Sequence, residues 1–124
     1  MRRKSILAGI IIGIAGFIYT MTPNNICGSL LFSFGLISIL ILKLNLYTGQ
    51  IAYINKTNFI KLFTILVYNI IGAMIIGVLL CPLISEKVEL IAINKINNLL
   101  YNTLINSICC GFCIYIAVES YKKT

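Results

Sequence analysis

The sequence contains no histidine and no tryptophan, and only 3 of its 124 residues are acidic. Without histidine there is no Ser–His or Cys–His pair, so the common arrangements for nucleophilic catalysis are excluded. The three acidic residues all lie outside the long apolar runs, and none of those runs therefore holds a pair of carboxylates for acid–base chemistry. A phosphate-binding glycine loop is also missing. We expect a protein that is not an enzyme and that uses no cofactor and no metal.

Besides the three acidic residues, cysteine is a residue type that could bind a metal, and it could also carry redox chemistry. Cys110 and Cys113 have the C-x-x-C spacing of such sites, but they lie in an apolar segment and no second pair accompanies them. Thiols in apolar segments are usually buried and inert. We expect buried, unreactive thiols at all five positions, Cys27, Cys81, Cys109, Cys110 and Cys113.

Charge is scarce and apolar residues are abundant. Hydrophobic residues make up 60% of the chain and charged residues 10%, and the mean hydropathy is +1.01. A soluble domain is about 45–50% apolar and about 25% charged. The net charge of +7 does not indicate nucleic-acid binding, because the basic residues stand at the ends of apolar runs, as they do in proteins that cross a membrane. We expect one integral membrane domain, residues 1–124, with the lipid bilayer as its surroundings.

Four apolar regions are long enough to be considered as membrane spans. A basic start followed by an apolar run resembles a signal peptide, but no small-residue cleavage site follows, so we expect an uncleaved first span. The expected spans are residues 6–21, 26–42, 59–84 and 99–118, with a short half-helix at 49–54 and an amphipathic interfacial segment at 85–98.

Residues 42–50, LKLNLYTGQ, place polar groups inside the apolar region 26–54. An unsatisfied polar group in hydrocarbon costs several kcal/mol, so this segment is either a surface turn or an interrupted helix that lines a cavity. With the N-terminus inside, the cytoplasmic side holds seven basic residues and one acidic residue (7 − 1 = +6), and the outer side sums to zero. The positive-inside rule then favours a multi-pass protein of the cell membrane with both termini cytoplasmic. Region 26–54 must cross once, which favours the broken helix.

Small residues and one asparagine predict the helix contacts. Gly9, Gly13 and Gly16 fall on one face of the first span, where small residues let another helix approach closely. Asn69 and Gly72 lie one turn apart in the third span. An asparagine within a span more often forms a hydrogen bond between helices than binds a substrate.

Four short motifs occur in a characteristic order: FSFGL at 32–36, YTG at 47–49, NIIGA at 69–73 and AV at 117–118. This combination resembles the formate/nitrite transporter family, in which the second span reads F-S-x-G-L, breaks, and gives L-F-T-[GS] at the break. The resemblance implies an all-α, aquaporin-like bundle, here of about four spans with the second helix broken. It also implies a homo-oligomer, a pentamer in that family, with a pore for small monovalent anions such as formate or nitrite in each protomer.

The resemblance assigns pore roles to five residues around the break. Thr48 matches the threonine of the family's flexible loop, which faces the pore centre. Phe32, Leu36 and Leu46 match positions near the apolar constrictions, and Tyr47 stands where phenylalanine is usual.

Three further residues would supply positive potential. Gly49 would open the half-helix with free N–H groups, which carry roughly half a unit charge. Lys95 falls in register with a lysine in the outer vestibule of some family members. Lys43 replaces a residue that is commonly glycine, and its side chain could face the pore or extend to the water interface.

The resemblance extends over the family's first repeat and fourth span only. The second broken helix, with its central histidine, has no counterpart in this sequence. Two functions therefore stay open. The chain is either a channel subunit, completed by further copies or by a second chain, or a truncated, non-transporting membrane protein with a structural or interaction role.

Overall fold

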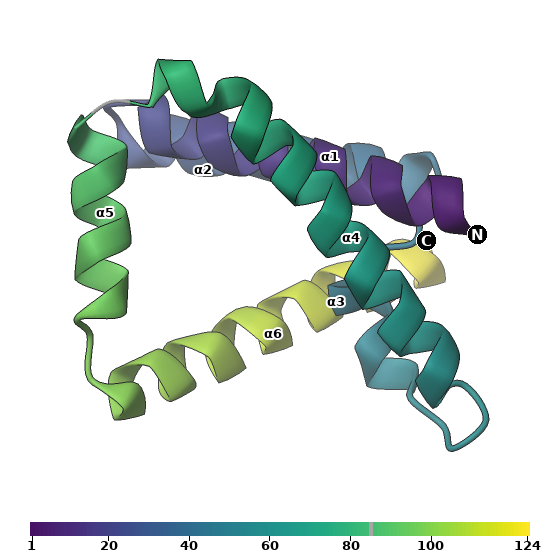
Figure 1. Ribbon diagram of the computed structural model, residues 1–124. Coiled ribbons are helices and arrows are strands. Elements are labelled where there is room, and N and C mark those ends of the chain that lie inside the picture. Colours follow the sequence, from purple (N-terminus) through teal and green to yellow (C-terminus); the bar gives the residue numbers. More distant parts are fainter. Residues whose placement is uncertain (85) are drawn as a thin grey trace.

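The computed structural model describes residues 1–84 and 86–124, and these residues form helices joined by short turns (Figure 1). The prediction of an all-helical fold is confirmed for them. The elements in chain order are α1 (Arg2–Met21), α2 (Asn25–Ile41), α3 (Tyr47–Gln50), the 3-10 turn η1 (Ile51–Tyr53), α4 (Phe59–Leu80), the 3-10 turn η2 (Cys81–Leu83), α5 (Glu86–Ile96) and α6 (Leu100–Lys123).

Three helical segments are long and apolar enough to cross a membrane: Arg2–Met21, Phe59–Leu83 and Leu100–Lys123. The fourth expected span, α2, has 17 residues. At about 1.5 Å per residue it extends roughly 26 Å, slightly less than the roughly 30 Å of a bilayer core. The described helices therefore fit a membrane protein by length and composition, with α2 as the short one.

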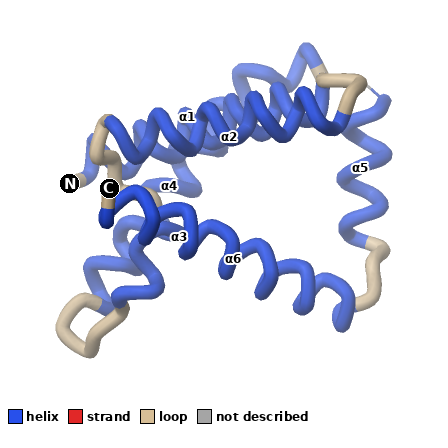
Figure 2. Tube along the Cα trace, turned by 180° about the vertical axis from the view of Figure 1, so that it is seen from behind, coloured by secondary structure: helices blue, strands red, loops and turns tan. Residues whose placement is uncertain are grey.

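The helices enclose an open frame (Figures 1 and 2). α1 packs against both α2 and α4, with α4 crossing in front of it in Figure 1, and its C-terminal end touches α5. α5 leads away from these three helices and α6 runs back along the other side, so that both chain termini lie at the same end of the molecule. The contact between α6 and the rest of the chain is made mainly through α3.

Glycine makes the contact between α1 and α4 close. Gly9 and Gly72 are both buried and lie against the opposite main chain. A Cβ atom at Gly9 would collide with the carbonyl group of Asn69, and one at Gly72 would collide with that of Ile6. The two helices therefore meet backbone to backbone here.

The other two glycines of the α1 face have different surroundings. A Cβ atom at Gly13 would lie 3.5 Å from the main chain of Ala73 on α4, an ordinary van der Waals distance. At Gly16 it would meet nothing within 4 Å. A packing role for Gly16 stays a prediction.

The prediction of buried thiols is wrong for the single chain. Val118 is the one buried residue of α6. No neighbouring helix covers the middle of α6, and the two cysteines outside it lie at the start of α2 and in η2. All five thiols are consequently free and exposed, at Cys27, Cys81, Cys109, Cys110 and Cys113.

The amphipathic segment expected at 85–98 corresponds to α5, an exposed helix with its acidic residues in the first turn and Lys95 in the last. Ser85 lies outside the described residues. α5 stands at the end of the molecule opposite to the termini (Figure 1).

Candidate functional site

The break begins with a helix cap that normally requires glycine. α2 ends at Ile41, and the N–H groups of Lys43 and Leu44 donate to the carbonyls of Leu40 and Ile39, at 3.1 and 3.0 Å. This pair of bonds is the Schellman motif, whose C′ residue adopts left-handed backbone angles and is usually glycine. Here that residue is Lys43, with φ of 50°, the one non-glycine residue among those described with a positive φ.

Replacing Lys43 with glycine should therefore stabilise the fold. A residue with a Cβ atom loses roughly 1–2 kcal/mol in the left-handed region, while glycine adds some entropy to the unfolded chain, so we expect a net gain of about 1 kcal/mol. Detergent-solubilised protein can be followed by circular dichroism on heating. The matched control is Leu42→Gly, because Leu42 has φ of −75° and should lose stability. A loss of stability in both variants would contradict the strain at Lys43.

Asn69 of α4 holds the other side of the break. Its side chain is 8% exposed, and its Oδ1 atom accepts a hydrogen bond from the N–H of Tyr47 at 2.8 Å. Its Nδ2 atom donates to the carbonyls of Asn45 at 3.0 Å and Ser5 at 2.7 Å. One amide thus satisfies main-chain groups on both sides of Leu46 and joins them to α1. This is the hydrogen bond between helices that was expected of an asparagine within a span.

The half-helix differs from the prediction in where it starts. It begins at Tyr47 and not at Gly49. The N–H of Tyr47 is taken by Asn69, and the N–H of Gly49 donates to the carbonyl of Leu46 at 3.2 Å. The expectation that Gly49 offers a free N–H group to an anion is therefore wrong, because the chain itself supplies the acceptor.

A groove of about 480 Å³ opens beside the break, within the size range of small-molecule sites. We call it the basic groove. Of the predicted pore residues it contains Leu36, Lys43, Leu46 and Gly49, and the last packs on α6, where a Cβ atom would lie 3.4 Å from Val118. The complete lining is Leu36, Ile39, Leu40, Lys43, Leu44, Asn45, Leu46, Gly49, Gln50, Tyr53, Asn58, Lys61, Leu62, Val118, Tyr121 and Lys122.

The remaining predicted pore residues lie elsewhere. Thr48 is exposed and does not line the groove, and Tyr47 is half-buried with its main chain bonded to Asn69. Phe32 packs edge-on against Tyr19, with ring centroids 6.5 Å apart. Lys95, on α5, lies at the opposite end of the molecule. The single chain therefore gathers half of the predicted residues into one site.

Tyr53 anchors η1 to the end of α6. Its hydroxyl donates a hydrogen bond to the carboxylate of Glu119. Lys122 places its Nζ atom 3.9 Å from the centroid of the Tyr53 ring, a cation–π contact. Lys123 pairs with Glu119 at 3.6 Å. This cluster holds one wall of the groove in place.

Lys61 and Lys122 were not predicted as site residues. They begin α4 and end α6, and charge placement alone had put them on the same side of the membrane. Nothing in their spacing from Lys43 indicated that all three would line one groove.

No protein-family model, curated protein or solved structure matches this chain. Within residues 1–84 and 86–124, no group of three His, Cys, Asp or Glu side chains could hold a metal ion.

Proposed function

We propose that the chain is a membrane channel or transporter subunit for small monovalent anions, of the formate/nitrite class. The observation that carries the proposal is the interrupted second helix, whose main chain is bonded from within by Asn69. Irregular backbone at membrane depth is tolerated where it is buried in protein or lines a water-filled cavity, and transporters place their ion sites at such breaks. A surface turn would need no buried amide to satisfy it.

The conformation of Lys43 supports the same proposal. In the formate/nitrite transporters this position is commonly glycine, and the chain adopts here the left-handed backbone that glycine favours. The left-handed backbone that a glycine would favour at this position is thus present, although the residue is lysine.

In the proposed mechanism, an anion is drawn to the basic end of the molecule by its positive potential. Apolar side chains such as Leu36 and Leu46 form constrictions that close by dewetting. The hydroxyl of Thr48, which is exposed on the single chain, donates to the anion once another subunit faces it. The assembly is a homo-oligomer, a pentamer by resemblance, or includes a second chain that completes the fold, with both termini cytoplasmic.

A flux measurement tests this proposal. When formate is added outside, the luminal pH of liposomes that contain the protein should change faster than that of empty liposomes. Thr48→Val removes the hydroxyl at nearly constant volume, and Lys43→Ala removes a charge at the break. We expect each to lower the formate flux at least threefold. Asn102→Ala, on the exposed part of α6, is the control that should leave it unchanged.

A second candidate function, a non-transporting structural or interaction protein, is favoured by the sparse packing of α6, where Val118 is the one buried residue. Such a protein would conduct no more formate than empty liposomes, and Thr48→Val and Lys43→Ala would have no effect. That result would exclude transport by this chain alone.

A further inference from the structure

We infer that the basic groove binds the phosphate headgroup of an anionic phospholipid, with the start of an acyl chain lying along its aliphatic side chains. The groove shares Leu36, Lys43 and Leu46 with the proposed anion pathway, but binding of a lipid there does not depend on transport. Three observations support the inference: the residue types that line the groove, the lysine charges in it, and its position at the basic end of the molecule.

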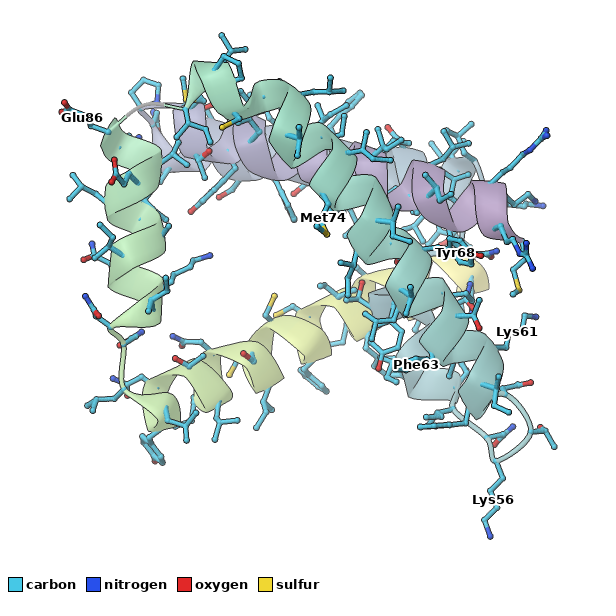
Figure 3. The ribbon with its side chains drawn as sticks, viewed as in Figure 1. Lys56, Lys61, Phe63, Tyr68, Met74 and Glu86 are labelled. Atoms are coloured by element: carbon cyan, nitrogen blue, oxygen red, sulfur yellow. The ribbon has the colours of Figure 1, made fainter. Side chains whose placement is uncertain are left out.

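The groove lining combines two kinds of side chain. Aliphatic side chains come from α2 and α4, with Leu36, Leu40 and Leu62 among them. Three lysines also line the groove: Lys43 in the turn after α2, Lys61 near the start of α4 (Figure 3) and Lys122 near the end of α6. A phospholipid, with an anionic head and an apolar tail, matches both kinds of side chain.

Lys43 and Lys61 form no ion pair with any described residue, while Lys122 lies over the Tyr53 ring and has Glu119 only as a nearby charge, not as an ion-pair partner. Among the described residues the single ion pair joins Lys123 to Glu119, and Glu119 also accepts the hydrogen bond of Tyr53. The other two acidic residues, Glu86 and Glu89, lie on α5 at the far end. Phosphate is a strong acceptor for ammonium groups, so an anionic headgroup supplies the charge that the chain itself does not.

The groove lies at the end of the molecule where α4 begins and α6 ends. Lys61 is the third residue of α4 and Lys122 the second last of α6. This end of the molecule holds all basic residues except Lys87 and Lys95, hence 10 − 2 = 8, against Glu119, which gives 8 − 1 = +7. The positive-inside rule places such an end in the cytoplasmic leaflet, which carries anionic lipids, and basic pockets between spans on that side bind lipid headgroups.

Native mass spectrometry of the full chain in neutral detergent tests the inference, with phosphatidylglycerol and phosphatidylcholine of identical acyl chains as probes. We expect phosphatidylglycerol to bind at least tenfold more tightly. Each lysine near a headgroup contributes about a fivefold change in affinity, so Lys61→Ala and Lys122→Ala should each weaken binding by about that factor. Lys61→Arg, which keeps the charge, should bind as the parent does and shows that the fold tolerates substitution.

Two controls make the test specific. Lys56→Ala removes an equal charge from the loop at the same end, where Lys56 points away from the helices (Figure 3), and should leave lipid affinity unchanged. Glycerol phosphate at the same concentration as the lipid should not displace it, because it lacks the acyl chain. Equal binding of both lipids, equal loss on Lys56→Ala, or displacement by glycerol phosphate would each overturn the inference. A lack of formate flux would not affect any of these outcomes, so the two proposals fail independently.

Discussion

Replacing Asn69 with alanine is expected to open the break and to lower the free energy of unfolding by about 3 kcal/mol or more. The Asn69 amide accepts from the N–H of Tyr47, the first of α3, and donates to the carbonyl of Asn45, which precedes that helix, so neither group has a partner within a helix. Each buried polar group left unsatisfied costs about 1–3 kcal/mol. The third bond, to the carbonyl of Ser5, which joins α4 to α1, is lost as well.

Hydrogen exchange followed by mass spectrometry gives the clearest measurement of this effect. The amides of residues 42–50 should exchange at least tenfold faster in the Asn69→Ala variant, while those in the middle of α2 keep their protection. Asn102→Ala is the matched control, because it removes the same amide from an exposed position on α6. Unchanged exchange at residues 42–50 would show that the break is held by something other than Asn69.

The same variant connects structure with the proposed transport. If the break forms part of an anion pathway, opening it should abolish the dependence of formate flux on Thr48, because the threonine would no longer have a fixed position. A merely destabilised protein that still conducts would keep the threefold effect of Thr48→Val on the remaining folded fraction.

The break itself could be predicted from the sequence, because polar residues in a long apolar region leave few alternatives. Lipid cannot satisfy Lys43 and Asn45, so the helix had to end close to them. An asparagine in the middle of the third span indicated a hydrogen bond between helices in the same way. These inferences depend on local composition, which a single sequence contains in full.

The partners of these groups could not be predicted. Which carbonyls the Asn69 amide meets depends on how α1 and α4 cross, and the crossing is set by contacts far apart in the chain. The prediction of a free N–H group at Gly49 was wrong for that reason. This N–H donates to the carbonyl of Leu46, and the half-helix begins earlier, at Tyr47. The thiols of α6 were expected to be buried because their segment is apolar, yet an apolar helix can face lipid or another chain as well as its own protein.

Replacing Gly72 with alanine should have the second large effect. At this position α4 touches the main chain of α1, and an added Cβ atom would collide with the carbonyl group of Ile6. Main-chain atoms cannot rotate away as a side chain can, so the helices must move apart, which typically costs about 1–3 kcal/mol for one extra carbon in a packed contact. Because the separation also strains the nearby bond from Asn69 to the Ser5 carbonyl, we expect a loss near the upper end of that range.

Gly77 offers a matched control for the Gly72 substitution on the same helix. A Cβ atom at Gly77 would meet nothing within 4 Å, so Gly77→Ala adds only helix propensity and should stabilise α4 by up to about 1 kcal/mol. Gly16→Ala on α1 should behave likewise in the monomer. Thermal unfolding in detergent would then separate Gly72→Ala from both controls by about 3–4 kcal/mol. Gly16→Ala provides one more distinction: if it is harmless in dilute detergent but destabilises the protein in membranes, Gly16 lies at a contact between subunits. Equal stability of Gly72→Ala and Gly77→Ala would contradict the close approach of α1 and α4.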